Sequence, residues 1–412
     1  MNISKQDYIK ADPDHTPSVW FSILLTALTS MGVLSVTLYV PAMLGIADDF
    51  QVDKVSVQVT LSLFLFGFAF GQLVYGPLSD QFGRRPVLLS GLAFYAVSSF
   101  ICALAQDIEA LQFARLFQGI GACCGAVISR AVVRDLYHQD QAIRVFAFVA
   151  TALSLTPAIA PIIGGQLTVW FSWQACFYFL AVVGSVMFIW SFFHLKESNT
   201  EKLSGAINPI RLAKIYWQVV SNLRFVALVM ISSLLFGGLM SYTTLSPFLM
   251  LEELKLTPDQ YGLLIMFTAA AYGFGSYMSG RMVKVIGHQA IMIGGPIISI
   301  GGALLMWALS FELSIIYLVL PASIYLIGNG FVAPTTMAAA MQPFPRIAGS
   351  ASAMMGAFQM GVAGIVSVLV NKVYDATALP LSQVMLGLAF ASLACAFYVI
   401  FTDRHIAAKQ PV

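Results

Sequence analysis

Long apolar runs separated by short polar connections set the pattern of the chain. Two of these runs, 55–75 and 87–105, contain no Asp, Glu, Lys or Arg. Each is long enough to cross a hydrocarbon core of about 30 Å as a helix. The pattern recurs and predicts twelve membrane-spanning helices, at 19–42, 55–77, 87–105, 112–134, 144–169, 173–194, 224–250, 260–281, 288–310, 313–336, 347–370 and 381–402.

The longest polar connection, 195–223, divides these helices into two sets of six. We therefore expect an all-α membrane protein built from two six-helix halves. Part of the connection, 209–220, mixes basic and apolar residues, which fits an amphipathic helix on the cytoplasmic surface or a solvated linker. The expected divisions are an N-terminal tail at 1–18, a first half at 19–194, an interdomain loop at 195–223, a second half at 224–402 and a C-terminal tail at 403–412.

The basic residues predict the orientation. If both termini are cytoplasmic, three of the 21 Lys and Arg residues, namely Lys54, Lys255 and Lys372, lie outside. Arg115 and Arg130 lie within a span, and the remaining sixteen lie on the cytoplasmic side. Because positive charge near short loops resists translocation, this distribution favours cytoplasmic termini.

Composition agrees with a multi-pass membrane protein. The chain is 59% hydrophobic and 10% charged, with a mean hydropathy of +0.84, whereas about a quarter of the residues in soluble proteins are charged. The net charge of +2 is dispersed over loops, so nucleic acid is not an expected partner. The five cysteines lie in apolar spans and are interpreted as buried hydrophobic residues, with no metal site. No phosphate-binding loop or nucleophile triad is apparent, so we expect neither an enzyme nor a cofactor.

The two halves resemble each other. Gly71 and Gly76 match Gly275 and Gly280 at a constant offset of 204. Two repeats of six helices predict a binding site at their interface near the bilayer midplane, open alternately to each side.

A charged turn is expected between the second and third spans, from Gly76 to Pro86. Its carboxylate suits the N-terminus of the next helix, and its glycine permits a bend that other residues resist. We predict a conformational latch that pairs charges across helices in one state and separates them in another; the alternative is a topological anchor. The latch residues are Gly76, Asp80, Gly83, Arg84, Arg85, Arg134 and Asp135.

Arg115 is a charged residue inside a predicted span. A guanidinium there is expensive unless it faces a wet cavity or a partner, so it indicates function; snorkelling to the interface is the alternative. Gln118 lies one turn further on the same helix face. For polar residues in other spans, ordinary interhelical hydrogen bonding competes with a role in the cavity. The predicted cavity residues are Arg115, Gln118, Thr37, Tyr39, Tyr242, Asn329 and Gln359.

The fifth span combines two prolines and two glycines: Pro157, Pro161, Gly164 and Gly165. The prolines remove helix hydrogen bonds, and the glycines let a neighbouring backbone approach closely. Such a helix can act as a pivot or seal one end of a cavity; simple packing is the alternative.

Four stretches resemble the major facilitator superfamily, and within it the Bcr/CflA-like drug/proton antiporters that confer bicyclomycin and chloramphenicol resistance. They are Gly76-x-x-x-Asp80-x-x-Gly83-Arg84-Arg85, Arg115–Gly119, Pro157–Gly165, and Ala348–Ser352 with Gln359. The third is similar to a signature associated with exporters. The resemblance implies alternating access in a bacterial inner membrane, coupled to protons.

The chain departs from this family at Thr37, where proton-coupled exporters of the branch commonly carry an aspartate. None of the 19 acidic residues lies near the middle of a predicted span. Three explanations stay open. Coupling runs through rim carboxylates such as Asp48 or Asp80, or a charged substrate completes Arg115, or transport has no fixed proton stoichiometry.

The expected function is export of small amphipathic organic molecules by a monomeric secondary transporter in the lipid bilayer, with protons and a small-molecule substrate as partners. One alternative is a dedicated exporter of an anionic metabolite or siderophore. Another is a membrane-embedded enzyme acting on lipid-linked substrates.

Overall fold

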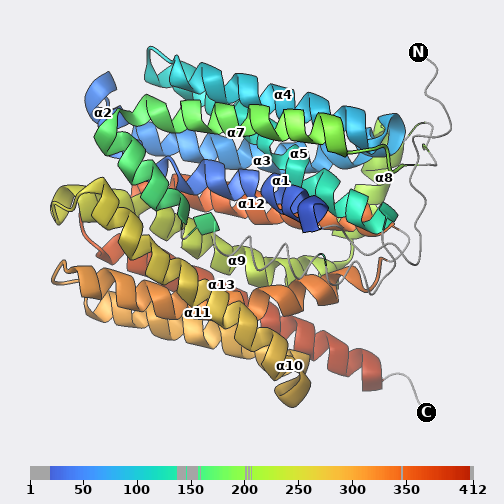
Figure 1. Cartoon of the computed structure of the whole chain (residues 1–412). Helices are drawn as coiled ribbons and strands as arrows, with labels where there is room; N and C mark the ends of the chain where they lie inside the picture. Colours follow the sequence, from blue (N-terminus) through green and yellow to red (C-terminus); the bar gives the residue numbers. More distant parts are fainter. Residues whose placement is uncertain are drawn as a thin grey trace.

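Long helices run side by side along one axis in the computed structural model (Figure 1). The structure describes residues 19–136, 145, 156–157, 159–199, 202, 205, 207–344 and 347–408. The predicted tails at 1–18 and 403–412 and the predicted span 144–169 lie wholly or partly outside these residues.

Ten helices among the described residues are long and apolar enough to cross a membrane, and a shorter apolar helix covers Ile159–Trp170. In chain order the helices are α1 (Val19–Thr37), η2 (Val40–Ala42), α2 (Met43–Phe50), α3 (Lys54–Phe82), α4 (Arg84–Ala103), α5 (Ile108–Leu136), α7 (Trp173–His194), α8 (Pro209–Val220), α9 (Leu223–Pro247), η3 (Phe248–Glu253), α10 (Pro258–Ala308), α11 (Ile315–Met341), α12 (Ala348–Lys372) and α13 (Leu379–Ala408).

The bundle exposes apolar side chains and buries many polar ones. Phe113 and Phe193 are exposed, whereas Thr244 and Ser367 are fully buried and share a hydrogen bond of 2.9 Å. Many hydroxyls donate to a carbonyl one turn earlier in their own helix, as Thr26 does to Ser22. This arrangement suits a lipid environment, in which an unpaired polar group is costly.

The turn predicted from Gly76 to Pro86 is much shorter than expected. Helix α3 continues through Pro77 to Phe82, and the chain turns at Gly83, whose φ of 107° is unfavourable for other residues. Pro77 has no N–H to donate to the carbonyl of Leu73. The hydroxyl of Tyr216 on α8 donates to that carbonyl instead, over 2.7 Å, so the helix persists beyond its apolar run.

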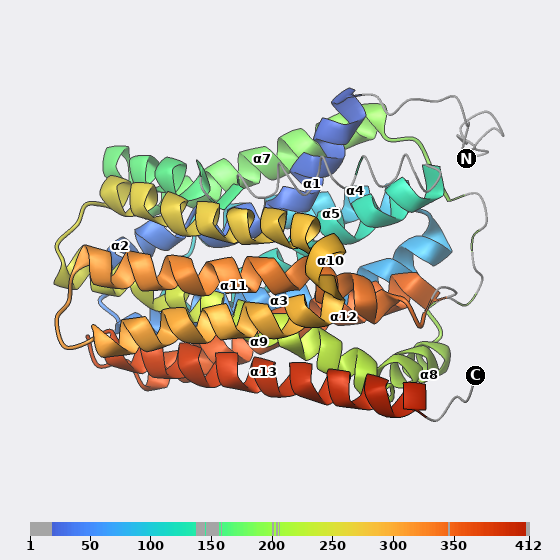
Figure 2. The ribbon, with the colours of Figure 1, turned by 90° about the horizontal axis from the view of Figure 1, so that it is seen from below.

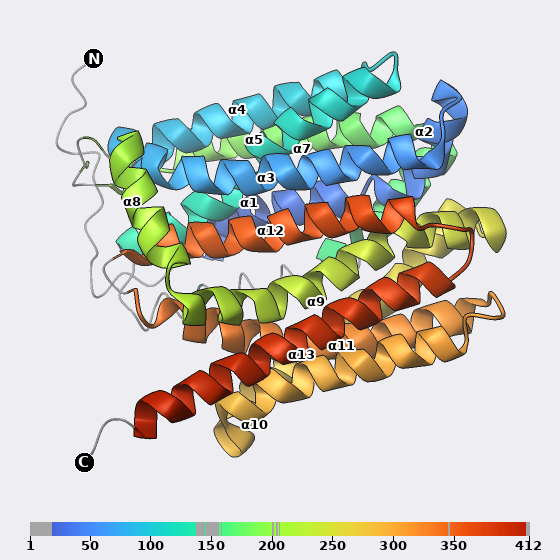
Figure 3. The same cartoon turned by 180° about the vertical axis from the view of Figure 1, so that it is seen from behind.

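Helix α8 has the bounds predicted for an amphipathic helix, which excludes a structureless linker at these residues. The Asn208 side chain accepts from the N–H groups of Ile210 and Arg211 and so caps its first turn. Figure 3 shows α8 crossing the end of the bundle beside α3, α9 and α12. Burial, followed by the nearby charge of Asp80, raises the pKa of Tyr216 to about 12, so its hydroxyl stays protonated and donates.

The predicted span 260–281 and all but the last two residues of the predicted span 288–310 fall within α10 (Figure 2). The backbone of α10 is not helical at Gly287, where φ is 79° and ψ is 166°. This position requires glycine and divides α10 into two helical parts.

Helices α3 and α5 are in backbone contact through a reciprocal pair of glycines. A Cβ on Gly119 would overlap the carbonyl oxygen of Phe64, and a Cβ on Gly67 would overlap that of Leu116. Small residues at such crossings allow close packing of membrane helices.

We predict that Gly119→Ala lowers the free energy of unfolding by about 1–3 kcal/mol, because the rigid backbone of α3 must shift. Thermal unfolding in detergent measures the effect. Gly361→Ala is the matched control, since a Cβ there meets nothing within 4 Å. Equal stability of the two variants would contradict the close-crossing model.

Candidate functional site

Arg115 lies inside the first half and is 0% exposed, so its guanidinium does not snorkel to the interface. The guanidinium carbon lies 4.4 Å from the ring centroids of both Tyr39 and Phe64, and 5.7 Å from that of Phe177. Three aromatic rings therefore surround the cation and stabilise it by cation–π interactions. We call these rings and Arg115 the arginine cage.

Hydrogen bonds fix one side of the arginine cage. Arg115 Nη1 donates to the carbonyl of Ser35, over 3.2 Å, and to Gln118 Oε1. Gln118 Nε2 donates to Ser99 Oγ over 2.8 Å. Nε and Nη2 of Arg115 have no hydrogen-bond partner among the described residues. The sequence predicted the Arg115–Gln118 pair, but it gave no signal for Phe64 or Phe177.

Thr37, the position of the missing aspartate, is the last residue of α1. Its hydroxyl donates to the carbonyl of Val33 over 2.9 Å, and its side chain is largely buried. Two residues later, the hydroxyl of Tyr39 shares a hydrogen bond of 2.7 Å with Thr60. Thr37 is thus two positions in sequence from Ser35 and from Tyr39, and both of these residues contact the guanidinium of Arg115.

The other predicted cavity residues lie in the second half. Tyr242 on α9 and Asn329 on α11 are buried, and the hydroxyl of Tyr242 and Nδ2 of Asn329 have no partner among the described residues. Gln359 on α12 is half-buried. Tyr325, one turn before Asn329, is also buried with its hydroxyl unpaired among these residues. No recorded contact joins these groups to the arginine cage within the described part of the chain.

The predicted latch residues Asp80, Arg84 and Asp135 form a compact cluster. Arg84 Nη1 lies 2.5 Å from Asp80 Oδ1 and 2.7 Å from Ser79 Oγ, and Arg84 Nε lies 2.9 Å from Asp135 Oδ2. The planar guanidinium presents its N–H donors in a rigid fork, so Nη1 and Nε donate to the two carboxylates at once. Arg134, about half exposed, approaches Asp135 at 3.8 Å. Gly76 has open space at its Cβ position.

Glu197 and Asn199 also bind to this cluster and were not predicted. Glu197 accepts from the backbone N–H groups of Arg84, over 2.8 Å, and of Arg85, over 3.3 Å, and so caps α4. Asn199 Nδ2 donates to the carbonyls of Ser79 and Asp80. A side chain at Gly83 would collide with the Glu197 carboxylate. Both residues directly follow the predicted sixth span, on the same predicted membrane face as the turn at Gly83. That location was the feature of the sequence that could have pointed to them.

Arg85 contacts a different helix from Arg84. Its Nη2 donates to the carbonyl of Phe192 over 2.8 Å, and its guanidinium lies 5.2 Å from the centroid of the Phe192 ring. Arg85 therefore ties the start of α4 to the end of α7.

The glycines of the predicted fifth span lie at close helix crossings. A Cβ on Gly164 would overlap the carbonyl of Leu38, and one on Gly165 would lie 2.5 Å from that of Pro258. Reciprocally, a Cβ on Gly262 would lie 2.8 Å from the carbonyl of Pro161. These small residues bring Ile159–Trp170 into backbone contact with α10. Pro157 is half-buried.

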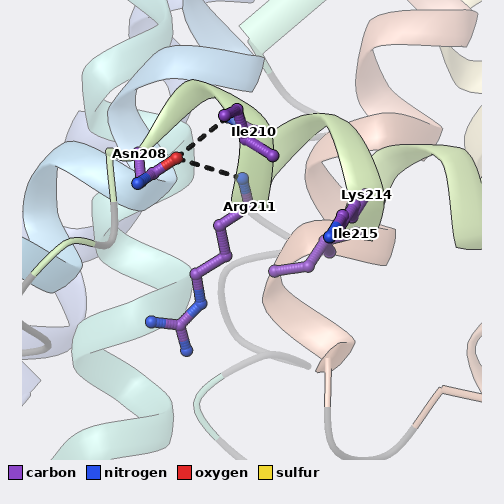
Figure 4. Close-up of a pocket in the computed structure, with 5 residues that line it drawn as sticks. All are labelled: Asn208, Ile210, Arg211, Lys214 and Ile215. Carbon is purple, nitrogen blue, oxygen red and sulfur yellow. Dashed lines mark hydrogen bonds between the residues drawn. The ribbon is translucent and has the colours of Figure 1, made fainter.

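A pocket of about 490 Å³ lies away from all of these groups, along α8 (Figure 4). It is lined by Asn208, Ile210, Arg211, Lys214 and Ile215. The pocket is open to the surface and contains none of the predicted cavity residues.

Comparison with known proteins decides the family. The model of the Major Facilitator Superfamily matches residues 23–368. The chain belongs to the Major Facilitator Superfamily. It is 28% identical to the bicyclomycin resistance protein homolog of Haemophilus influenzae, over 94% of this chain and 98% of that protein. It is 29% identical to multidrug resistance protein D of Escherichia coli, over 84% of this chain and 87% of that protein.

A third relative, a chloramphenicol resistance protein of Pseudomonas aeruginosa, is 27% identical and covered to 90% in both chains. Solved structures agree on the fold. A POT family transporter in complex with a thioalcohol conjugated peptide superposes with a TM-score of 0.76 at 13% identity, over 97% of this chain and 99% of that one. The xylose transporter XylE from E. coli superposes with a TM-score of 0.71 at 13% identity, over 92% of this chain and 95% of that one.

Membership in this superfamily confirms the predicted class. The chain is a multi-pass transporter of the inner membrane, and the alternative of a membrane-embedded enzyme was wrong. The resemblance to bicyclomycin resistance proteins is also confirmed.

We predict that Asp135→Asn lowers the free energy of unfolding by about 3 kcal/mol, because the guanidinium of Arg84 stays buried with half of its counter-charge removed. Arg134→Gln is the matched control, and we expect a change of at most about 1 kcal/mol from this exposed side chain. Thermal unfolding of both purified variants measures the difference. Similar losses of unfolding free energy in the two variants would show that burial of the Arg84–Asp135 pair does not contribute to stability.

Proposed function

We propose that this transporter exports small amphipathic organic molecules from the cytoplasm by alternating access. The observation that carries the proposal is the similarity, over nearly the full length of both chains, to proteins named for resistance to bicyclomycin, chloramphenicol and multiple drugs. A transporter confers resistance by moving the compound out of the cell. Unpaired buried polar groups in the second half, at Tyr242 and Asn329, offer hydrogen bonds without charge to such a compound.

The proposal includes twelve membrane spans. Ten of the described helices are long and apolar enough to be spans. The shorter apolar helix Ile159–Trp170 supports an eleventh span, and the part of α10 before Gly287 supports a twelfth. An even number of spans puts both ends of the chain on one side, and the basic residues place that side in the cytoplasm. In this arrangement the halves are 19–194 and 224–402, the loop is 195–223, and a single copy contains the whole pathway.

Close contacts at the proposed outer ends support a state closed to the outside. Ile159–Trp170 touches α10 through Gly165, Pro258, Pro161 and Gly262. The latch lies at the opposite, cytoplasmic end of the first half. The sequence predicted that the charges of the latch separate in one state of the cycle. In place of that role, we propose that the paired cluster of Arg84, Asp80 and Asp135 holds α3, α4 and α5 as one body while the halves rock.

Proton coupling is proposed without a carboxylate at the midplane. Every acidic residue that the structure describes lies in a connection or near a helix end, as the sequence predicted. The coupling proton is then carried by a rim carboxylate or by the substrate itself.

An anionic substrate is a second candidate, favoured by the arginine cage. Nε and Nη2 of Arg115 lack hydrogen-bond partners among the described residues, and the aromatic rings around the guanidinium supply no full negative charge. A carboxylate of an organic acid would complete this site if the cage opens to the cavity during transport.

The proposed function is tested in cells that lack their own drug exporters. We expect expression of the wild-type chain to lower the accumulation of bicyclomycin or chloramphenicol, and a protonophore to restore it. Accumulation unchanged from vector controls across a broad drug panel would refute export of such compounds.

Arg115→Gln separates the two candidate substrate classes. If an anion binds the guanidinium, we expect transport of acidic compounds to fall about tenfold, with transport of neutral compounds much less affected, because a charge-assisted hydrogen bond is lost. Rates are measured in reconstituted vesicles. Arg115→Lys retains the charge without the planar stacking, so partial recovery for acids supports a charge effect. Equal transport of both classes by Arg115→Gln would refute the anionic candidate.

Thr37→Asp places a titratable group two positions in sequence from Ser35 and Tyr39, which both contact Arg115. We expect wild-type vesicles to show substrate-triggered proton movement with a pH-sensitive dye, and Thr37→Asp to shift the pH dependence of transport, since the new carboxylate titrates near Arg115. Thr37→Asn, which cannot titrate, is the matched control. Absence of proton movement in the wild type together with its appearance in Thr37→Asp would refute coupling in the native chain.

A further inference from the structure

Helices α3 and α12 face each other across the boundary between the halves (Figure 3). Three contacts set their register: Lys54 Nζ lies 5.8 Å from the centroid of the Tyr374 ring, Phe66 Cε1 lies 3.0 Å from the Cβ position of Gly364, and the amide of Gln72 adjoins Gly356. Residue numbers rise along α3 as they fall along α12, and the sum of each pair stays between 428 and 430. The helices therefore run antiparallel with a constant register.

This register places Gln58 opposite Asn371 and Ser62 opposite Ser367. Within each helix the two residues are four positions apart and share one face. Gln58 is 0% exposed, Ser62 1% and Asn371 3%, so the boundary encloses them.

The polar atoms of Gln58, Ser62 and Asn371 lack hydrogen bonds. Both amide atoms of Gln58, both of Asn371 and the hydroxyl of Ser62 have no partner among the described residues. Ser367 differs, because its hydroxyl pairs with that of Thr244 at 2.9 Å. Buried polar atoms are nearly always paired, so five unpaired atoms on facing helices require an explanation.

An ion pair lies at the outer end of the same boundary. Lys54 Nζ lies 2.6 Å from Glu252 Oε2, which joins α3 to η3 of the second half. The other ion pairs recorded for the described residues stay within one half: Arg84–Asp80, Arg84–Asp135, Arg134–Asp135 and Arg224–Asp403. Lys54 therefore links the halves electrostatically, through Glu252 and the ring of Tyr374, beside the unpaired amides.

We propose that Gln58, Ser62 and Asn371 form a polar site between the halves, the outer amide site, which is enclosed while the halves meet and is exposed to bulk water when their outer ends separate. The inference rests on the alternating access proposed above. Hydration then supplies the hydrogen bonds that the closed state lacks. The closed state bears the free-energy cost of these unmet bonds, and the Lys54–Glu252 pair offsets part of it.

The outer amide site thereby biases the transporter toward opening on the outside. If the boundary served only to pack the halves together, apolar side chains of similar size would stabilise it better than unpaired amides. The unpaired amides lower the stability of the closed state, so that the outer ends can separate in each transport cycle.

The double variant Gln58→Leu/Asn371→Leu tests this inference. Leucine has a similar volume and removes the unmet bonds, so we expect a higher Tm and an export rate lowered about tenfold, with binding of an exported drug from the cytoplasmic side retained. Met360→Leu, on the same face of α12, is the matched control and should leave export unchanged. A lower Tm, or a higher Tm with unchanged export, would overturn the proposal.

Labelling of Asn371→Cys by a membrane-impermeant maleimide provides a second measurement. We expect labelling from the outside to increase during export, with the wild-type chain and its five native cysteines as the blank. Labelling that does not depend on export would overturn the proposal. If the wild type exports none of the compounds tested, the proposed function fails, whereas the Tm of the double leucine variant still decides whether the amides destabilise the closed state.

Discussion

A polar group without a partner is expensive in the apolar interior of this bundle, and the main features of the structure follow from that constraint. The carbonyl of Leu73, left free by Pro77, accepts from Tyr216 of another segment. The charge of Arg115 is placed among three aromatic rings. Elsewhere, serine and threonine hydroxyls bond to the preceding turn of their own helix. Sites where the constraint is left unmet are therefore the places to look for movement or binding.

The two prominent arginines meet this constraint in different ways. Arg84 is neutralised by two carboxylates and lies at a helix terminus, where the Glu197 carboxylate also caps α4. Arg115 has aromatic faces and neutral acceptors, which stabilise a cation without cancelling its charge. The first arrangement suits a fixed joint between helices. The second leaves a positive charge available to a negative or ionisable ligand.

Local patterns predicted much of the fold, and distant pairings escaped prediction. The limits of α8 followed from its mixed basic and apolar residues, and Arg115 was singled out because a charge inside an apolar run needs a reason. The continuation of α3 beyond its apolar run was missed, because the hydroxyl that rescues it lies 143 positions away. Glu197 was missed for the same reason, at a separation of 113. Phe64 and Phe177 are aromatic residues in apolar runs, where sequence carries no sign of which way a ring faces.

The Tyr216–Leu73 hydrogen bond also shortens the part of the interdomain linker that can move freely. Residues 195–223 look like a long, loose tether, yet Glu197 fastens one part to the start of α4 and Tyr216 fastens another to α3. The chain that is free to span from the first half to α9 is then only the few residues after Tyr216. Because this linker is short, the second half stays at a high local concentration beside the first. The linker permits tilting about a shared edge while opposing their complete separation.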